Sequence, residues 1–458
     1  MKSYWDSSET LKTYPKLEKD IETDICIVGA GIVGITCAYT LGNLGYKVCI
    51  LEKDKVFNGV SVNTTAKITS EHSLTYNHMV DKFGMDKAKQ YLYANENAIR
   101  QIENIIKKEN IECDFEIQSS YVYTTKQEEI KALKQELKTL KNMDFDAQYI
   151  EEIDLPFSIL GAVKFNNQAQ FNPKKYVKGL LKKIEENEGE IYENTKVIDI
   201  TNDCITIVET NDIKTIKVKS KYVIMATHYP IINAPGYHFL KLYQEKSYAI
   251  AIETEKEVFN GIYINPSAPT YSFRTIKDGD KRLILIGGSE HKTGTKQDIS
   301  KSYINLEEKA KELYPDMKVV YRWSTQDCMA LDNIPYIGVF SDLMKNVFIA
   351  TGFNKWGMTS SYIAADIIRD LINNNKNEYA EVFYGTRFHP VLNAKELADM
   401  GKEIGKGITG FKNPRCSHLG CELQWNELEK TWDCPCHGSR FSKEGKSLHS
   451  PSIKDLEL

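Results

Sequence analysis

The sequence predicts an α/β protein of more than one domain, and three observations support this. Residues 24–28 have the pattern of a buried strand, 32–44 of a helix and 47–51 of a second strand, which together make a βαβ unit. Four of the ten cysteines fall within 21 residues near the C-terminus, which indicates a separate C-terminal unit. Further strands alternate with helices and are expected at 120–124, 195–200, 222–226, 282–287 and 347–350.

Length and composition narrow the class of protein. At about 100–200 residues per domain, the 458 residues predict two to four domains. Hydrophobic residues make up 41% and charged residues 27%, which excludes a disordered chain. The net charge of -4, without a basic run, excludes an electrostatic footprint for nucleic acid. No secretory signal or membrane-spanning run is visible, so we expect a cytoplasmic protein with a small-molecule ligand.

A G-x-G-x-x-G motif lies between the first strand and the first helix. Gly29 allows the tight turn, Gly31 lets the backbone approach a pyrophosphate, and Gly34 permits close packing of helix on strand. Ile32 and Val33 open the helix, whose N-terminal amides favour an anion. The motif therefore predicts a dinucleotide site, and the alternative is a glycine turn with a packing role alone.

Glu52 follows the second strand, about 20 residues after the glycines. A carboxylate at this place accepts hydrogen bonds from a ribose 2′-hydroxyl, which argues against the 2′-phosphate of NADP. Glu52 and the adjacent Lys53 are therefore candidate cofactor-binding residues. The motif by itself does not separate FAD from NAD.

Three stretches resemble the D-amino acid oxidase superfamily of FAD enzymes, of the glycine oxidase and sarcosine oxidase type. They are 24–54, 221–230 (KYVIMATHYP) and 322–372, and the resemblance extends over about 20–376. It implies FAD as cofactor, bound by a Rossmann-type domain beside a mixed-sheet substrate domain. The FAD-binding parts would be about 20–100, 155–235 and 320–376, and the substrate parts about 100–155 and 235–320.

The resemblance also implies residues along the cofactor. The loop after the Glu52 strand would pass under the pyrophosphate and the isoalloxazine, and the backbone of Val197 would meet the adenine. The helix that follows 347–350 would point its N-terminal amides at the pyrimidine end of the flavin, where reduction places negative charge. The implied contacts, besides Val197, are Thr64, Thr65, Ala66, Gly352, Phe353, Lys355, Trp356, Gly357, Met358 and Thr359.

The C-terminal pattern Cys416-x-His418 followed by Cys434-x2-His437 resembles a Rieske [2Fe-2S] centre. In that family two cysteine thiolates hold one iron and two histidine imidazoles hold the other. The resemblance assigns Cys416 and Cys434 to the first iron, and His418 and His437 to the second. A zinc ribbon is the alternative, but its usual C-x2-C spacing is not the spacing found here.

The same resemblance implies a disulfide between Cys421 and Cys436, as in the respiratory branch of the Rieske family. By this resemblance the module at 411–458 would be a small, β-rich cluster-binding subdomain that lacks the β-sandwich base of a complete Rieske domain. Because about 50 residues bury too little surface to be stable alone, we expect it to lean on the flavoprotein body. The glycine-containing stretch 377–410 is predicted to be a linker.

Two further places carry polar side chains of interest. Arg274 precedes a strand of the predicted substrate domain and could hold a substrate carboxylate, with a surface salt bridge as the alternative. Glu290 and His291 lie on a turn where active-site groups can sit, although a solvated turn is the preferred interpretation.

These observations predict an FAD-dependent oxidoreductase of the amine or amino acid oxidase type. The flavin would take a hydride from a C–N bond, and electrons would leave singly through the Rieske cluster to an unidentified carrier. One alternative is a reductase fed through the cluster by a ferredoxin-type donor, and another is a redox sensor or electron carrier without a dedicated substrate. A Rieske-oxygenase iron site at Glu71, His72 and His78 is the least favoured alternative.

Overall fold

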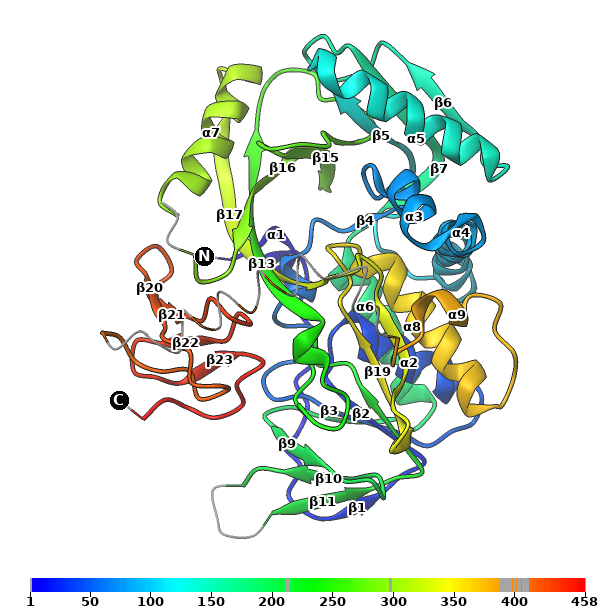
Figure 1. Ribbon diagram of the computed structural model, residues 1–458, viewed down its shortest axis with the longest axis vertical. Coiled ribbons are helices and arrows are strands. Elements are labelled where there is room, and N and C mark those ends of the chain that lie inside the picture. Colours follow the sequence, from blue (N-terminus) through cyan, green and yellow to red (C-terminus); the bar gives the residue numbers. More distant parts are fainter. Residues whose placement is uncertain are drawn as a thin grey trace.

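The computed structural model describes residues 2–210, 215–295, 299–387 and 412–457, together with the single residues 398, 401 and 405. Figure 1 shows a body with one sheet region below and another above, and a small C-terminal module on one flank. The termini of the chain both lie near this flank.

The lower region is built on a largely parallel sheet, in the order β18-β19-β12-β2-β3-β8 among the described strands. Its central strands are apolar and buried on both faces, as parallel strands between two layers must be. Only β18 runs antiparallel to its neighbour. The bounds are β2 Ile25–Val28, β3 Val48–Leu51, β8 Glu190–Tyr192, β12 Tyr222–Met225, β18 Tyr336–Ser341 and β19 Met344–Thr351.

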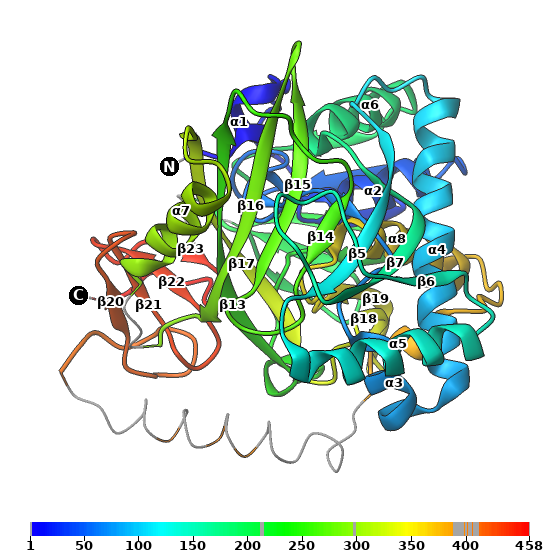
Figure 2. The same cartoon turned by 90° about the horizontal axis from the view of Figure 1, so that it is seen from above.

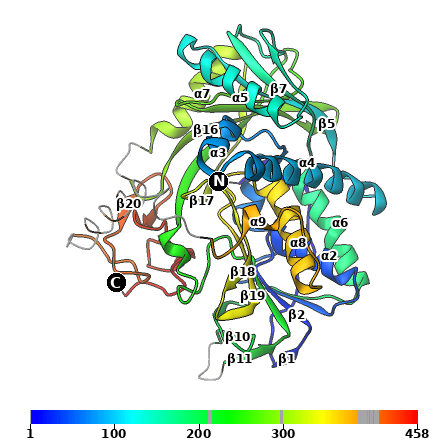
Figure 3. The same ribbon diagram turned by 45° about the vertical axis from the view of Figure 1, so that its right-hand side comes forward.

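Helices cover one face of this sheet, and a small second sheet covers the other. Figure 3 shows α2 (Ile32–Gly42), α6 (Pro173–Glu186) and α8 (Gly357–Ile372) side by side, with α4 (Met85–Lys108) above them. Asn172 caps α6 by accepting from the amides of Lys174 and Lys175 at 3.2 Å. The second sheet has the order β1 (Ile21–Glu22), β11 (Ile216–Lys219), β10 (Ile205–Val208) and β9 (Val197–Ile200).

The upper region is a mixed sheet in the order β17-β13-β16-β15-β14-β5-β7-β4, with β6 on β7. All these pairs are antiparallel except β14 with β5. Helices α3 (Thr75–Phe83), α5 (Ile130–Asn142) and α7 (Lys301–Leu313) pack around it (Figure 2). The strands are β4 Lys67–Ile68, β5 Glu116–Thr124, β6 Ala147–Ile150, β7 Gly161–Gln170, β13 Leu242–Glu253, β14 Ile262–Ile264, β15 Tyr271–Asp278, β16 Lys281–Lys292 and β17 Lys318–Ala330.

The C-terminal module is an antiparallel meander. Its strands are β20 (Gln424–Asn426), β21 (Thr431–Asp433), β22 (Arg440–Ser442) and β23 (Ser447–His449). Leu423 and Phe441 are the large apolar side chains at its centre, and the four cysteines fill the rest of that small core. The module is small and β-rich, as predicted, and it lies against the ends of β13 and β17 (Figure 1).

The predicted α/β fold with a mixed-sheet second region is confirmed. The first part of the predicted linker, 377–387, contains α9 (Ala380–Phe383) and packs on the body. There, Arg387 donates two hydrogen bonds to buried Asp332, at 2.8 and 3.0 Å. The rest of that segment lies outside the described residues, apart from three positions, so the linker and the other domain boundaries stay predictions.

Candidate active site and cluster site

A cavity of about 1030 Å³ lies between the two regions of the body and the C-terminal module. At one end is the glycine turn between β2 and α2. Gly29 has φ of 106°, and a Cβ there would lie 2.6 Å from the carbonyl oxygen of Ala226, just after β12. A Cβ on Gly34 would overlap the backbone of Gly29, so this turn and its close packing need both glycines.

The amides around this turn are held by side chains. The amide of Ala30 donates to one Glu52 oxygen at 2.8 Å, and the amide of Asp54 donates to the other at 2.9 Å. The amide of Ile32 donates to the Ser61 hydroxyl at 3.0 Å. Burial raises the pKa of the Glu52 carboxyl, although the amide donors oppose this shift. Glu52 therefore joins the glycine turn to the loop after β3 at the cavity wall.

The structure brings most of the predicted cofactor residues to this one cavity. Four of them do not line it: Gly34 packs on the backbone of Gly29, Gly352 packs against neighbouring side chains, and Ala66 and Thr359 are buried. The predicted residues that do line it are Gly29, Gly31, Ile32, Val33, Glu52, Lys53, Thr64, Thr65, Val197, Phe353, Lys355, Trp356, Gly357 and Met358.

The N-terminus of α8 closes the opposite side of the cavity. Gly352 has φ of 71° at the turn that leads from β19 to α8. The indole of Trp356 stacks on His72, with the ring centroids 4.3 Å apart. A helix N-terminus therefore meets the cavity here, which is favourable for negative charge.

The wall formed by β13, β16 and β17 carries carboxylates. Lys355 pairs with Glu245 at 3.2 Å, while Asp327 and Glu290 line the cavity nearby. Burial raises the pKa of Asp327 to about 6, and Lys355 partly opposes this shift. The hydroxyl of Ser247 donates to Asp327 at 3.3 Å. This end of the cavity is therefore acidic.

Arg274 does not have the position that we expected for it. It is buried, and its donors end on backbone carbonyls: Thr65 at 3.0 Å, Thr275 at 3.1 Å, and also Ala66. Neither the substrate contact nor the surface salt bridge fits, because the guanidinium is outside the cavity and away from solvent. Arg274 instead holds the 64–66 loop against the upper sheet.

The least favoured iron site also finds no support. His72 is buried, with one ring nitrogen 2.8 Å from the Tyr91 hydroxyl and the other 2.9 Å from the carbonyl oxygen of Thr69. Glu71 accepts from the Ser120 hydroxyl at 2.7 Å. Both side chains are therefore used in internal hydrogen bonds.

The cluster loops bring the predicted ligands together. The thiols of Cys416 and Cys434 are within hydrogen-bonding reach of one another. The rings of His418 and His437 lie 5.2 Å apart at 87°. The remaining cysteines, Cys421 and Cys436, are joined by a disulfide, which leaves two thiols and two imidazoles at this end of the module.

The donor set fits a [2Fe-2S] cluster better than it fits an ordinary core. Both ring nitrogens of His437 are buried without a hydrogen-bond partner, which is costly unless a bound group satisfies one of them. Two thiolates with two imidazoles is the mixed ligation of a Rieske centre.

Comparison with known families agrees with this geometry. Residues 24–371 match the family described as FAD dependent oxidoreductase, and residues 403–457 match the Rieske [2Fe-2S] domain. The chain belongs to the FAD-dependent oxidoreductases. This oxidoreductase carries a C-terminal Rieske domain, so its cofactors are FAD and a [2Fe-2S] cluster.

Individual proteins are also similar to this chain over most of its length. The Bacillus subtilis protein YhfW, named for a Rieske 2Fe-2S centre, is 34% identical over 495 aligned residues, covering 99% of this chain and 97% of its own. Gamma-glutamylputrescine oxidoreductase from Escherichia coli is 21% identical over 406 residues, 86% of this chain and 93% of its own. The fold is that of glycine oxidase from Geobacillus kaustophilus, with a TM-score of 0.67, 19% identity, and coverage of 80% and 99%. No helix of the described segments is long and apolar enough to cross a membrane.

Several cavity residues were missed at the sequence level. They are Asp327 and Ser247 on the upper sheet, His228 after β12 and His449 of the module, and none of them was singled out as a site residue. A signal for Asp327 did exist, because a carboxylate in an otherwise uncharged stretch of a long strand is unusual. His449 could not have been found, because its place depends on how the module docks.

Proposed function

We propose that this FAD-dependent oxidoreductase oxidises a small amine and passes the electrons to its own Rieske cluster. The observation that carries the proposal is that body and module line one cavity. Residues 446–450 of the module face the same space as the glycine turn and Glu52. Across this contact the ammonium of Lys53 donates to the carbonyl of Leu448 at 2.9 Å.

In this proposal the glycine turn and the start of α2 hold the pyrophosphate of FAD, and Glu52 accepts from the ribose. Thr64 and Thr65 lie under the cofactor, and Val197 meets the adenine. The α8 turn, from Phe353 to Met358, faces the flavin ring. Cys416, Cys434, His418 and His437 are the proposed ligands of the cluster. The FAD supplies the hydride acceptor, and the residues of the chain orient substrate and cofactor.

The acidic wall supports an amine over an amino acid as the substrate. A substrate carboxylate is usually held by a cation, most often arginine. Among the described residues no arginine lines the cavity, and the lysine beside the acidic wall, Lys355, already pairs with Glu245. Asp327 and Glu290 would instead attract an ammonium group. The similar E. coli protein is named for an amine substrate, gamma-glutamylputrescine, which is consistent with this choice.

The test is anaerobic mixing of the purified protein with monoamines, diamines and amino acids, read as bleaching of the flavin absorbance. We expect amines to reduce the flavin, and Asp327→Asn to lower kcat/KM for them by about 10- to 100-fold, because one charge-assisted hydrogen bond is lost. Asp342→Asn, at an exposed position, is the matched control.

Two other outcomes would replace the proposal. Bleaching by amino acids at equal rates in wild type and Asp327→Asn would rule out the amine assignment. Bleaching only by a reduced ferredoxin-type donor would reverse the direction of electron flow, and the cluster would then feed the flavin.

A further inference from the structure

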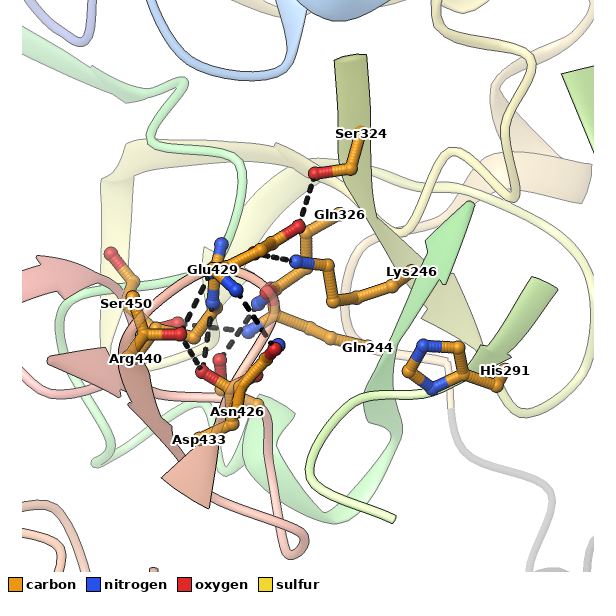
Figure 4. A network of polar contacts seen from close by, with 12 residues as sticks. Gln244, Lys246, His291, Ser324, Gln326, Asn426, Glu429, Asp433, Arg440 and Ser450 are labelled. Carbon is orange, nitrogen blue, oxygen red and sulfur yellow. Dashed lines mark hydrogen bonds and ion pairs between the residues drawn. The ribbon is translucent and has the colours of Figure 1, made fainter. Parts of the chain in front are cut away.

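The second cluster loop, residues 434–439, is fastened to the body by two buried glutamines (Figure 4). Gln244 on β13 donates to the carbonyl of His437 at 2.9 Å and to that of Ser450 at 2.8 Å. Gln326, on the neighbouring β17, donates to the carbonyl of Gly438 at 2.7 Å and also to the Gln244 side chain. Their exposed fractions are 1% and 3%. A carboxamide pair inside a sheet therefore satisfies the backbone of a cluster-ligand loop.

The two backbones approach so closely that each side needs a glycine. A Cβ on Gly294, just after β16, would lie 2.6 Å from the carbonyl carbon of Cys434. A Cβ on Gly438 would lie 2.6 Å from Cβ of Gln244. Both glycines have positive φ, 75° and 84°. The body and the loop therefore pack so closely that a Cβ at either position would overlap the other side, as in a protein interior.

A charged network locks the same interface beside the glutamines. Lys246 on β13 has no exposed side-chain surface and pairs with Glu429 of the module, which also pairs with Arg440. Arg440 bonds Asp433 at 3.0 Å, and the Ser324 hydroxyl on β17 donates to Glu429. Burial alone would raise the pKa of Glu429, yet Arg440 and Lys246 lower it to about 2. Two cations and two carboxylates thus balance at the contact, and losing one would leave a buried charge unpaired.

The imidazole edge of the cluster site also faces the body. A ring nitrogen of His418 lies 2.9 Å from the side-chain oxygen of Asn233, in the loop after β12. The ring of Phe239 lies edge-on to both ligand histidines, 6.2 Å from His418 and 5.9 Å from His437. Both imidazoles are therefore covered by residues of the flavoprotein body.

We infer that Gln244 and Gln326 are positioning residues of the cluster. They hold the His437 loop on β13 and β17, so the body supplies the base that the short module lacks. The cluster is then fixed at one place beside the flavin cavity and does not swing to meet a partner. The inference holds for either direction of electron flow and does not depend on the substrate.

The test uses the full-length holoprotein with Gln244→Leu and Gln326→Leu together. Leucine keeps a similar volume but removes the donors to the His437 and Gly438 carbonyls. We expect the midpoint potential of the cluster, from a titration followed by electron paramagnetic resonance, to fall. We also expect amide hydrogen exchange of 434–439 to become at least tenfold faster. Gln135→Leu, on the exposed side of α5, is the matched control and should change neither quantity.

Iron and sulfide content are measured alongside. A double variant with full iron, unchanged potential and unchanged exchange would overturn the inference. If the double variant loses its cluster, the milder Gln326→Leu decides, because Gln244 then keeps both of its hydrogen bonds to the module. A lower potential with full iron in that variant supports the inference, and wild-type values overturn it. These readouts involve no amine, so failure of the proposed function would not affect them.

Discussion

The nucleotide end of the body and the cluster module both serve a cofactor, but they are built in opposite ways. At the glycine turn the cradle is mostly backbone, held by strands that are buried on both faces in a large core. In the module, four of the six buried apolar residues are cysteines, so the core and the cluster site are nearly the same atoms. Cofactor binding should therefore be distributed over many groups in the body and concentrated in a few in the module.

The largest expected effect tests this contrast directly. Cys434→Ala removes one proposed thiolate ligand and part of the module core, so we expect complete loss of iron and sulfide with FAD retained in the body. Cys204→Ala, at a buried cysteine in the turn between β9 and β10, should keep both cofactors. Metal and sulfide assays together with the flavin spectrum provide the measurement. Loss of FAD from Cys434→Ala as well would mean that the two sites are not independent.

In the body, removing one buried side chain should lower the free energy of unfolding without unfolding the protein. Arg274→Met leaves the carbonyls of Thr65 and Ala66 without their donor, and unsatisfied buried acceptors cost about 1–3 kcal/mol each. We expect a destabilisation of about 3 kcal/mol, measured by denaturant unfolding followed through flavin release. Arg322→Met, at an exposed ion pair with Glu307, should cost less than about 1 kcal/mol. Equal effects of the two variants would show that the buried arginine has no special role.

Arg274 also shows where sequence reasoning reaches its limit. It was predicted to precede a strand of the substrate domain, whereas it lies within β15, a strand that was not predicted. Ser272 lines the cavity, and Arg274, two residues later on the same face, lies past the end of the cavity. The glycine turn, Glu52 and the four proposed cluster ligands could be predicted because each is part of a local pattern with fixed spacing. The depth of a cavity along a strand is set by packing between distant segments, which no local pattern records.

The docking of the module was foreseen only in outline. Its shortness predicted that it would lean on the body, but Gln244, Gln326 and Lys246 belong to no motif. The available signal was polar residues in the middle of long strands, where apolar ones are usual. Such residues predict a partner without saying which one, because the partner lies almost 200 residues away in the chain, as for Gln244 and His437 with a separation of 193.

A smaller effect, on FAD affinity, is expected for Glu52, because the glycine turn and many other groups also contact the cofactor in the proposed site. Glu52→Ala removes a proposed charged acceptor for the ribose, so we expect FAD to bind about 10- to 100-fold more weakly. The protein should stay folded, because two amide contacts are lost in a large core. The dissociation constant of Glu52→Gln should lie between those of Glu52→Ala and wild type. Glu22→Ala, at an exposed position, should bind FAD as wild type does. Titration of the apoprotein with FAD gives the dissociation constants, and an unchanged value for Glu52→Ala would remove Glu52 from the proposed site.

The smallest effect concerns how the free energy of unfolding of the body depends on pH. Glu136 on α5 is buried and accepts from the amides of Tyr76 and Asn77, at 2.7 and 2.8 Å, in the first turn of α3. Burial raises its pKa to about 7, although these donors oppose the shift. Because the folded state keeps this proton above the ordinary pKa of a glutamate, folding should become less favourable as the pH rises from about 4.5 to 7, and then level off.

The slope of the free energy of unfolding against pH in that window should be up to about 1.4 kcal/mol per pH unit steeper in wild type than in Glu136→Gln, which cannot titrate. Flavin release reports unfolding of the body, and bleaching of the cluster reports the module. We expect the slope difference in both signals, because the module is fastened to β13 and β17 and is too small to stay folded without the body. A slope difference in the flavin signal alone would show that the module unfolds independently of the body, and would contradict the role of the body as the base of the module.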